Sequence, residues 1–518
     1  MGEGDEARAI HRLETAAQLT HTSYRSPHWD VGMRGCSLVY LWLAVSFVLG
    51  CGGKEEAAVT PECLVDVYTR GGFFGEPKST VNEVIPTVVE VRWQTAEPTI
   101  GWVEFGEAGD LSLTTSRDAS PTREHEFLLL GLPHSSEVTV RAMAIKDGNE
   151  ICAVDQTLKT GALDPGLVEM TLTESDPTQA AGGYTVVALS CWHGECSQSS
   201  GASGFVVILD ELGRIVWFYA VQRGIFRAYL TLNRDAVAIN YQAGSDDNEG
   251  AIGIISLDGS EVTSLYAPGI HTDFVQVDDE RYASLAWTVQ TVEDGDEERK
   301  LLGDLILEIT TDGSYTVAWD IFDHVDPDLE ADYHLRDFGD EGEVEEWSYL
   351  NGINYDPADD SYYLTSRSLN AVFKVDRGSG ELLWTAGNDW GDFELSSGNT
   401  PIFYPHSVQP IDGGLLLFNS EDECTLPNSY ALECSAAAEL SMDFETWEFD
   451  ESWCYATEDC LIVSALGNAQ RLTNDNTMLV LSTTGQIDET TPDGELVWRV
   501  NSDFGWEFGF AERVDSLY

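Results

Sequence analysis

The sequence predicts an all-β protein, with a small β-sandwich at residues 62–162 followed by a six-bladed β-propeller at residues 163–518. Short runs alternate apolar and polar residues and are separated by Gly, Pro, Asp and Ser turns, which is the pattern of antiparallel strands. A turn that begins with Asp and leads into a short strand ending in an aromatic residue recurs six times, at a spacing near that of propeller blades. No long segment has the 3.6-residue period of a helix.

The composition is strongly acidic. Of the 518 residues, 90 are Asp or Glu and 27 are Lys or Arg, so the formal net charge is −63. The apolar fraction of 43% is nevertheless high enough to fill a large core, which excludes an intrinsically disordered chain. Such a charge repels phosphate backbones, so we expect no nucleic-acid partner. We interpret the acidity as an adaptation to solubility or high salt.

The first part of the chain is interpreted as a processing segment. Residues 36–50, CSLVYLWLAVSFVLG, have the length of a signal-peptide core and are too short for a confident membrane span. The run ends directly before Cys51 in a pattern that resembles a bacterial lipobox, so Cys51 is the expected lipidation site. We expect an exported lipoprotein anchored at the outer membrane, on its periplasmic face or the cell surface; a single-pass anchor is the alternative. The expected segments are a mis-annotated leader at residues 1–32, a lipoprotein signal peptide at residues 33–50 and a linker at residues 51–61.

Cysteine usage agrees with export. Cys36 leaves with the signal and Cys51 takes the lipid, so eight of the ten cysteines remain, an even number in an oxidising compartment. Proximity in the sequence favours the disulfides Cys191–Cys196, Cys424–Cys434 and Cys454–Cys460, which leaves Cys63 and Cys152 to pair across the first domain. Eight cysteines allow 105 connectivities, so this pairing is one of several. A metal site at residues 191–196 competes with one of these pairs, but no second Cys/His cluster completes a tetrahedral set, so we expect no metal centre and no cofactor. Asp-rich turns at residues 245–250 and 356–360 leave calcium binding open, although neither has the EF-hand pattern.

Five alternating runs predict the strands of the sandwich: residues 88–95, 101–107, 125–132, 137–145 and 151–160. Residues 130–133, LGLP, followed by residues 138–141, VTVR, resemble the E–F corner of fibronectin type III domains, with Val138 where that fold usually has Tyr. We expect this domain to be a spacer between the membrane and the propeller.

The six copies of the repeated turn and strand are Asp210–Trp217, Asp258–Tyr266, Asp312–Trp319, Asp376–Trp384, Asp443–Trp453 and Asp493–Trp498. Propeller blades surround a central channel, so polar residues from distant blades converge at its mouth. His271 and His406 each precede an alternating strand, and we expect both at one mouth. His324 and His334 lie in the acidic stretch 321–341, which we interpret as an exposed insertion.

Three segments resemble the bacterial arylsulfate sulfotransferases. Residues 347–387, WSYLNGINYDPADDSYYLTSRSLNAVFKVDRGSGELLWTAG, resemble the central signature of that family, in which Trp-x-His-x-Asn-Ser leads to Ser-Arg and then to a Lys-x-Asp stretch. Residues 403–420, FYPHSVQPIDGGLLLFNS, resemble its Gln-His-Asp segment, and residues 464–482 resemble its later Gly-x-x-Gln-x-Leu stretch. The resemblance implies a six-bladed propeller, often preceded by a β-domain.

The resemblance also implies a reaction: sulfuryl transfer from a phenolic sulfate ester to an acceptor phenol through a sulfohistidine. It implies that His406 is the nucleophile, that Arg367 binds the sulfuryl oxygens, that Asn351 lies near the sulfate and that His271 is an additional active-site histidine. Tyr349 stands where the family has another central histidine. A tyrosine, with a pKa of about 10, is a poorer acid/base than histidine at neutral pH.

Two other functions fit the same channel mouth. One is a non-catalytic cell-surface lipoprotein that binds anionic or glycan ligands, and the other is an aryl sulfatase that uses water as the acceptor. A chain with a charge of −63 does not steer polyanions, and Arg367, Lys374 and Arg377 are few cations for such a binding site.

Overall fold

The computed structural model divides the chain into two compact units, Met1–Glu62 and Cys63–Tyr518. It describes residues 63–65, 72–167, 169–190, 202–241, 249–294, 297–329, 333–388, 390–396, 401–422, 434–502 and 507–518. The predicted leader, signal peptide, lipidation site Cys51 and linker lie outside these residues, and so do Cys191, Cys196 and Cys424. None of the helices in the described ranges is long and apolar enough to cross a membrane.

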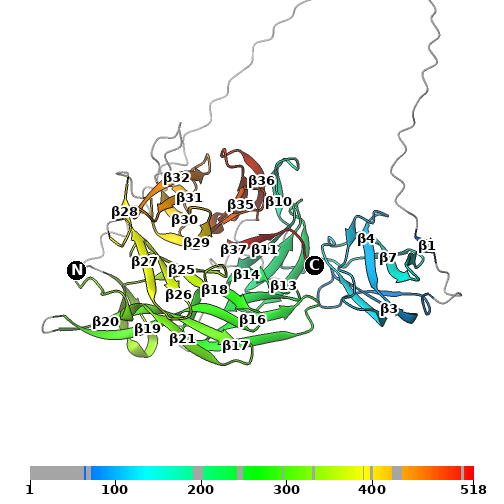
Figure 1. The fold of residues 1–518 in the computed structure, drawn as a ribbon, viewed down its shortest axis with the longest axis horizontal. Helices are drawn as coiled ribbons and strands as arrows, with labels where there is room; N and C mark the ends of the chain where they lie inside the picture. Colours follow the sequence, from blue (N-terminus) through cyan, green and yellow to red (C-terminus); the bar gives the residue numbers. More distant parts are fainter. Residues whose placement is uncertain are drawn as a thin grey trace, which may run out of the picture. The chain divides into compact units, whose positions relative to one another are not determined.

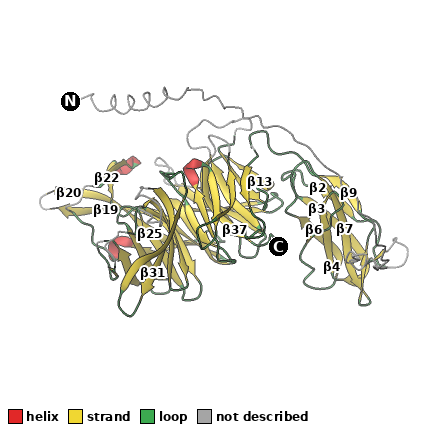
Figure 2. Ribbon diagram, turned by 90° about the horizontal axis from the view of Figure 1, so that it is seen from above, coloured by secondary structure: helices red, strands yellow, loops and turns green. Residues whose placement is uncertain are grey.

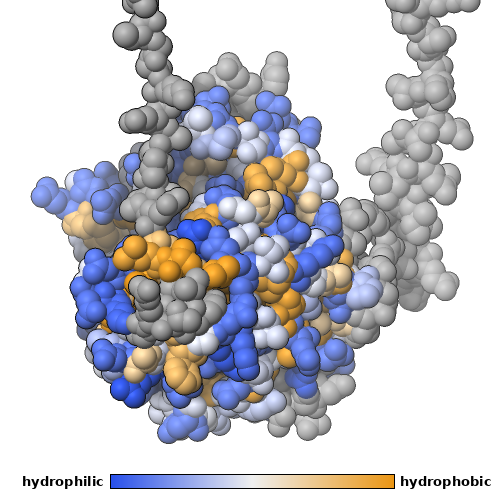
Figure 3. Space-filling view, turned by 90° about the vertical axis from the view of Figure 1, so that its right-hand side faces the viewer, coloured by the Kyte–Doolittle hydropathy of each residue, from blue (hydrophilic) through white to orange (hydrophobic). Residues whose placement is uncertain are grey.

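Nearly all of the regular structure is strand (Figure 2), which confirms the all-β prediction. The helices of the described residues are single 3₁₀ turns: η1 (Ile321–Asp323), η2 (Gly339–Glu341) and η3 (Ser482–Thr484). On one face of the molecule, hydrophilic side chains predominate and hydrophobic patches lie between them (Figure 3), as expected for so acidic a chain.

A two-sheet sandwich comes first. One sheet has the strand order β1-β8-β7-β4-β5, with β9 also paired to β7, and the other has the order β2-β3-β6. Alternate residues of β3 are buried, which is the pattern the sequence predicts for a strand with one face on the core. The predicted strand 151–160 is two strands, β8 and β9. The bounds are β1 (Leu64–Val65), β2 (Lys78–Val81), β3 (Val89–Thr99), β4 (Gly101–Glu107), β5 (Leu113–Thr114), β6 (Thr122–Leu129), β7 (Glu137–Lys146), β8 (Asn149–Cys152) and β9 (Gln156–Lys159).

The rest of the described chain contains antiparallel meanders of four strands. The first consists of β37 (Glu507–Val514), β11 (Tyr184–Ser190), β12 (Gly204–Leu209) and β13 (Ile215–Val221), so the last strand of the chain completes the first meander. The second consists of β14 (Ile225–Leu230), β15 (Ala236–Tyr241), β16 (Glu249–Ser256) and β17 (Val262–Pro268). The third consists of β18 (Ile270–Asp278), β19 (Arg281–Asp294), β20 (Glu297–Thr310) and β21 (Tyr315–Asp320).

The fourth meander consists of β24 (Leu350–Asp356), β25 (Ser361–Ser366), β26 (Ala371–Asp376) and β27 (Leu382–Gly387). The fifth consists of β29 (Pro405–Ile411), β30 (Gly414–Asp422), β31 (Cys434–Asp443) and β32 (Glu448–Ala456). The sixth consists of β33 (Asn468–Arg471), β34 (Thr477–Leu481), β35 (Gln486–Thr490) and β36 (Leu496–Asn501). Four further strands pair with the meanders: β10 (Thr171–Ser175), β22 (His334–Asp337), β23 (Glu343–Glu346) and β28 (Glu394–Leu395).

The first strands of the meanders form a closed ring. We call β37, β14, β18, β24, β29 and β33 the ring strands, because each contacts the next and β33 contacts β37. Figure 1 shows the red strand β37 beside the green strand β11, which brings the two ends of this domain together. The prediction of a propeller-like domain after a sandwich is confirmed, whereas the domain boundaries and the number of six blades stay predictions.

Apolar clusters fill the space between neighbouring meanders. One cluster joins the third meander to the fourth, another joins the fourth to the fifth, and the cluster around Trp498 joins the sixth to the first. Strands such as β12 and β25 are therefore buried along their whole length. The cluster around Trp217 also includes Ile85 and Leu130 of the sandwich, so apolar contacts link the sandwich to the first two meanders.

The repeated turn and aromatic strand marks the last strand of each meander. Trp217, Trp319, Trp384 and Trp498, for example, lie in β13, β21, β27 and β36. In each case the Asp turn is the hairpin that connects the third strand to the fourth. The sequence repeat therefore corresponds to the structural repeat.

Two of the predicted disulfide pairs are wrong. Cys63–Cys152 is present as predicted, but Cys434 is bonded to Cys460, and Cys454 is disulfide-bonded as well. The predicted pairs Cys424–Cys434 and Cys454–Cys460 therefore do not form. The pairing of β31 with β32 places Cys454 opposite Ala438 and brings the chain after β32 back to the start of β31. Proximity across the hairpin decides the pairing, rather than proximity in the sequence.

Candidate active site

A cavity of about 400 Å³ lies where the ring strands begin, and we call it the histidine cavity. Its volume is in the range of small-molecule sites. Four of the residues predicted for the site line it: His271, Tyr349, Asn351 and His406. They come from the third, fourth and fifth meanders, which are far apart in the sequence. Arg367, the fifth predicted residue, is not among the lining residues but lies close by.

His406 presents an unpaired nitrogen to this cavity. The side chain is 5% exposed, and its Nδ1 lies 3.1 Å from the side-chain amide of Asn351. Its Nε2 is buried and has no hydrogen-bond partner among the described residues. Burial, together with the nearby charge of Arg367, lowers the pKa of His406 to about 3. The imidazole is therefore neutral at pH 7 and retains a nucleophilic lone pair.

Asn351 is placed to decide which nitrogen of His406 carries the proton. The side-chain oxygen of Asn351 accepts a hydrogen bond of 3.1 Å from the hydroxyl of Thr365. A threonine hydroxyl can also accept, so the amide can be turned by 180° without losing either contact. In the turned orientation the amide oxygen accepts from Nδ1–H of His406. This tautomer puts the lone pair on Nε2, in the cavity.

Arg367 follows β25, and no carboxylate of the described residues neutralises its charge. Its guanidinium carbon lies 4.7 Å from the ring centre of Tyr404 and 5.4 Å from that of Tyr349. We find no ion pair of Arg367 in the described ranges. In a chain with 90 acidic residues, a guanidinium held between two aromatic rings beside His406 is available to an anion.

Strained backbone surrounds the cavity. Thr272, Tyr349, Tyr404 and Leu466 have positive φ angles of 41°, 42°, 44° and 62°, and each lies at or just before the start of a ring strand. Non-glycine residues adopt this conformation at a cost, and such strain gathers at functional sites. At Tyr349, burial raises the pKa of the phenol, and the nearby Glu346 raises it further. Tyr349 therefore keeps its proton at neutral pH.

The imidazole of His271 lies against a carboxylate, a hydroxyl and an indole ring. Its Nε2 lies 2.9 Å from Oδ1 of Asp304, and its Nδ1 lies 3.1 Å from the hydroxyl of Thr272. Its ring stacks on Trp287, with the ring centres 4.8 Å apart. Asp304 is buried and also accepts hydrogen bonds from the Ser348 hydroxyl and from the Leu350 amide at 2.8 Å. Asp304 and Thr272 therefore lie against the two ring nitrogens of His271, although Nε2 makes no hydrogen bond of good geometry in the described part of the chain.

The sequence analysis missed seven polar or aromatic lining residues: Phe226, Thr272, Trp287, Asp304, His334, Arg336 and Glu346. The acidic stretch 321–341 is not simply an exposed insertion, because its last part forms β22, which pairs with β23. One signal was present in the sequence. His334 and Arg336 are two residues apart, the spacing that puts two side chains on the same face of a strand.

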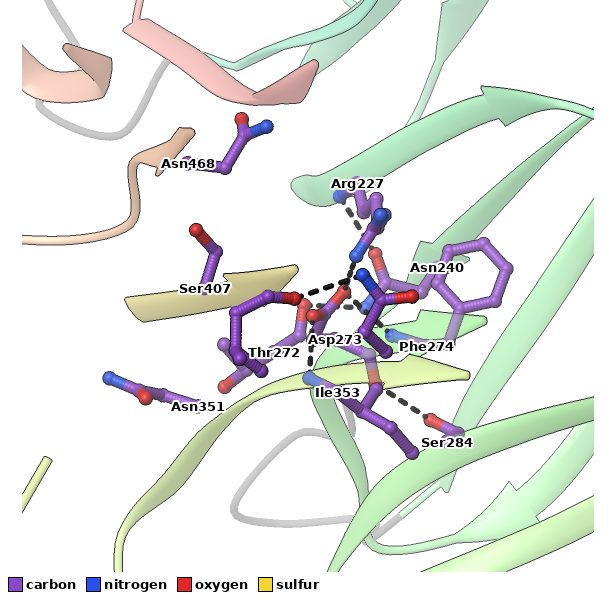
Figure 4. A network of polar contacts seen from close by, with 12 residues as sticks. Arg227, Asn240, Thr272, Asp273, Phe274, Ser284, Asn351, Ile353, Ser407 and Asn468 are labelled. Atoms are coloured by element: carbon purple, nitrogen blue, oxygen red, sulfur yellow. Dashed lines mark hydrogen bonds and ion pairs between the residues drawn. The ribbon is translucent and has the colours of Figure 1, made fainter. Parts of the chain in front are cut away.

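A second cavity, of about 370 Å³, lies further along the ring strands, and we call it the amide cavity. Here polar groups pair with one another across neighbouring meanders (Figure 4). Asp273 lies between the guanidinium of Arg227, whose Nη1 is 2.8 Å from its Oδ1, and the amide of Ile353, which donates to its Oδ2 at 2.9 Å. Asn240 accepts from the Arg227 amide and donates to the carbonyl of Thr272. These bonds connect the second, third and fourth meanders.

A family model described as Arylsulfotransferase (ASST) matches residues 169–503, which is more than half of the chain. The chain belongs to this family. Family membership associates it with aryl sulfotransferase activity. The matched range contains every predicted active-site residue and excludes the sandwich. No curated protein matches the chain.

Solved structures resemble the fold only distantly. A protein of unknown function from Bacteroides caccae is 13% identical, with a TM-score of 0.36, and the match covers 64% of this chain and 98% of that one. The β-propeller domain of Cps50 (Swd1) from Myceliophteria thermophila is 9% identical, with a TM-score of 0.34, and the match covers 66% of this chain and 99% of that one. We draw nothing about function from these likenesses.

Relative to the arylsulfotransferase pattern, one departure lies inside the histidine cavity. Tyr349 replaces the family histidine and, with its raised pKa, does not exchange protons readily at neutral pH. In the described part of the chain, no group of three or more His, Cys, Asp or Glu side chains is placed to hold a metal ion.

Proposed function

We propose that this arylsulfotransferase moves a sulfuryl group from a phenolic sulfate ester to an acceptor phenol, with His406 as the nucleophile. The observation that carries the proposal is the unpaired Nε2 of a buried, neutral His406 at the histidine cavity. A neutral imidazole attacks sulfur, whereas an imidazolium does not. The depressed pKa thus keeps the nucleophile active throughout the neutral and mildly acidic range.

In the first half of the reaction, the lone pair of His406 Nε2 forms a bond to sulfur, and the bond between sulfur and the aryl oxygen breaks. The electron pair of that bond leaves on the aryl oxygen, which takes up a proton to become a phenol. In the second half, an acceptor phenol loses its proton as its oxygen attacks sulfur. The nitrogen–sulfur bond breaks, and the lone pair returns to His406.

Arg367 and Asn351 act in both halves of the reaction, the first by binding the sulfuryl group and the second by orienting His406. The three sulfuryl oxygens carry negative charge, and a planar guanidinium without a carboxylate partner can bind two of them. When its amide is turned by 180°, Asn351 accepts from Nδ1–H of His406 and donates to the hydroxyl of Thr365, and this orientation holds the tautomer with its lone pair on Nε2. Because His406 is 5% exposed, little water competes with the acceptor phenol for the sulfohistidine.

The test is an assay of the purified full-length protein with 4-nitrophenyl sulfate, with and without added phenol. Release of 4-nitrophenol that depends on phenol supports transfer. Equal release without phenol indicates an aryl sulfatase, and no release in either case indicates a binding protein; both results overturn the proposal.

A second measurement locates the intermediate. Mass spectrometry of peptides, prepared at high pH after mixing with donor alone, should find one added SO₃ group on the peptide containing His406. His406→Ala should lower donor cleavage by about 10⁴-fold or more and remove the adduct. Ser407→Ala is the matched control, because Ser407 is the next residue but lines the amide cavity. A fully active His406→Ala variant would rule out this nucleophile.

We also propose that the protein works outside the cytoplasm, anchored through a lipid on Cys51. The disulfides Cys63–Cys152 and Cys434–Cys460 support an oxidising compartment. Cys51→Ser should abolish labelling by a fatty-acid probe in a bacterial host. Unchanged labelling and membrane retention of the variant would contradict the lipoprotein.

A further inference from the structure

The proposed reaction needs a group that gives a proton to the departing aryl oxygen and later takes one from the acceptor phenol. Three candidates at the histidine cavity do not fit this role. His406 is the nucleophile, and both ring nitrogens of His271 lie close to other side chains, Asp304 and Thr272. The raised pKa of Tyr349 makes it a weak acid. A fourth candidate, His334, also lines the cavity.

β22 carries His334 to the cavity wall through a specific strand pairing. β23 pairs in parallel with β20, with Glu346 next to Leu302, and antiparallel with β22, with Glu346 opposite His334. Leu302 and Glu346 both line the cavity. The position of His334 is therefore set by the register of two ladders rather than by a free loop.

Side-chain contacts hold β22 in this place. Nη1 of Arg336 lies 2.6 Å from Oε1 of Glu346, and the Arg336 guanidinium lies 4.3 Å from the ring centre of Trp287. Trp287 in turn stacks on His271. Contacts through the guanidinium of Arg336 and the indole of Trp287 therefore connect β22, which carries His334, to His271.

His334 differs from the other two histidines of the cavity in exposure. His271 and His406 are buried, whereas His334 is exposed. An exposed imidazole can exchange protons with water at neutral pH, which a group that must alternate between acid and base has to do. The charged and titratable groups on the surrounding elements are Arg336 and Asp337 on β22, Glu343, Glu345 and Glu346 on β23, Arg299, Lys300 and Asp304 on β20, and Tyr349 before β24.

We propose that His334 is the general acid and base of the sulfuryl transfer, a role that rests on the proposed function of His406. As the imidazolium, His334 gives its proton to the aryl oxygen while the sulfur–oxygen bond breaks, and it becomes neutral. As the neutral imidazole, it takes the proton of the acceptor phenol while the phenol oxygen attacks sulfur. His334 therefore regains its proton by the end of one turnover, and no other reactant is needed.

The test compares donors that differ in leaving-group ability. 4-Nitrophenolate leaves readily without a proton, whereas 4-methylphenolate, a much stronger base, needs one. With donor alone and no acceptor phenol, His334→Ala should lower the rate of the first half of the reaction, measured as adduct formation on His406, by about 10²-fold or more for 4-methylphenyl sulfate. For 4-nitrophenyl sulfate the same rate should change by less than about threefold.

The pH profile gives a second readout. In the wild-type protein, the first-half rate with 4-methylphenyl sulfate should fall as the pH rises through the range in which imidazolium loses its proton, and His334→Ala should lack this dependence. His324→Ala is the matched control, because His324 is also exposed in the same acidic stretch but stacks on Trp319 and does not line the cavity. It should behave like the wild-type protein with both donors.

A double variant separates a chemical role from a structural one. Adding Tyr349→His to His334→Ala puts an imidazole back on the wall of the same cavity, and this should restore part of the rate with 4-methylphenyl sulfate. Equal losses with both donors in His334→Ala, or no loss with 4-methylphenyl sulfate, would overturn the role of His334. A wild-type protein that forms no adduct with either donor would instead overturn the proposed function itself.

Discussion

The two cavities along the ring strands differ in how their guanidinium groups are paired. In the amide cavity the ion pair of Arg227 with Asp273 and the side chain of Asn240 are hydrogen-bonded across neighbouring meanders. At the histidine cavity, Nε2 of His406 and the nearby guanidinium of Arg367 have no protein partner within the described ranges. The amide cavity also has buried atoms without a hydrogen-bond partner among the described residues, Tyr229 Oη and Glu512 Oε2, but Asp273 neutralises its guanidinium. A guanidinium without such a carboxylate, beside a neutral imidazole, therefore identifies the end of the ring that can bind an anion.

This difference indicates that the amide cavity stabilises the fold, whereas the histidine cavity is available for binding and catalysis. Bonds across the amide cavity join neighbouring meanders, so they stabilise the closed ring. Groups at the histidine cavity are left unsatisfied at a cost to stability, and strained residues such as Tyr349 and Tyr404 add to that cost. Substitutions at the histidine cavity should therefore affect activity, and those at the amide cavity should affect folding.

Among the tests that compare the two cavities, the largest effect is expected at Arg367. Arg367→Lys keeps a positive charge but loses the planar pair of donors, so kcat/KM for 4-nitrophenyl sulfate should fall by about 10²–10³-fold. The melting temperature should stay close to that of the wild-type protein, because no ion pair of Arg367 is found in the described part of the chain. Steady-state assays and calorimetry on the same samples check both. A variant with normal turnover would remove Arg367 from the site.

The converse pattern is expected at Asp273. Asp273→Ala leaves Arg227 without its carboxylate and removes the acceptor of the Ile353 amide, which should lower the free energy of unfolding by about 3 kcal/mol. Urea denaturation measures this change. Turnover per folded molecule should be similar to that of the wild-type protein. Loss of activity at full stability would break the division between the two cavities.

The corrected disulfide provides a test outside both cavities. The Cys434–Cys460 bond closes a segment of 26 residues, and its removal should lower stability by about 3 kcal/mol without lowering turnover. Cys434→Ala combined with Cys460→Ala is the variant, and thermal unfolding is the measurement. Peptide mapping without reduction should find these two cysteines linked to each other. A linked Cys454–Cys460 peptide would contradict the pairing.

The smallest effect is the pH dependence that His406 imposes on stability. In the folded protein its pKa is about 3, whereas an unfolded histidine titrates near pH 6.5, so between these values the unfolded chain binds one more proton. Acidification through this window therefore favours unfolding. From pH 7 to pH 5 the wild-type protein should lose about 2 kcal/mol more than His406→Gln. Parallel stability curves for the two proteins would contradict a buried neutral His406.

Much of this organisation could be predicted from the sequence. The Asp turn and aromatic strand repeat marked the last strand of each meander, because an exposed hairpin turn and an aromatic residue packed between meanders constrain residue type locally. The family motifs pointed to His406, Asn351 and Tyr349, and the structure brings these residues to one cavity with His271. Their catalytic roles stay predictions.

Other features could not be read from the sequence, because they depend on contacts between distant segments. Nothing local distinguishes His334, which lines the cavity, from His324, which stacks on Trp319; the register of β22 with β23 and of β23 with β20 makes the difference. Proximity in the sequence likewise misled the pairing of Cys434, whose partner is set by the hairpin of β31 and β32.

The sequence by itself thus determined the all-β fold class, the order of its domains, the strand repeat and the family, because periodicity, turn residues and motifs are local properties of the chain. Only the tertiary structure decided that His406 stays neutral, that His271 lies between Asp304 and Thr272, and that His334 remains exposed. Burial beside Arg367 lowers the pKa of His406, Asp304 lies against Nε2 of His271, and β22 leaves His334 in contact with water. Desolvation and pairing are set by neighbours in space, and the closed ring of strands supplies those neighbours.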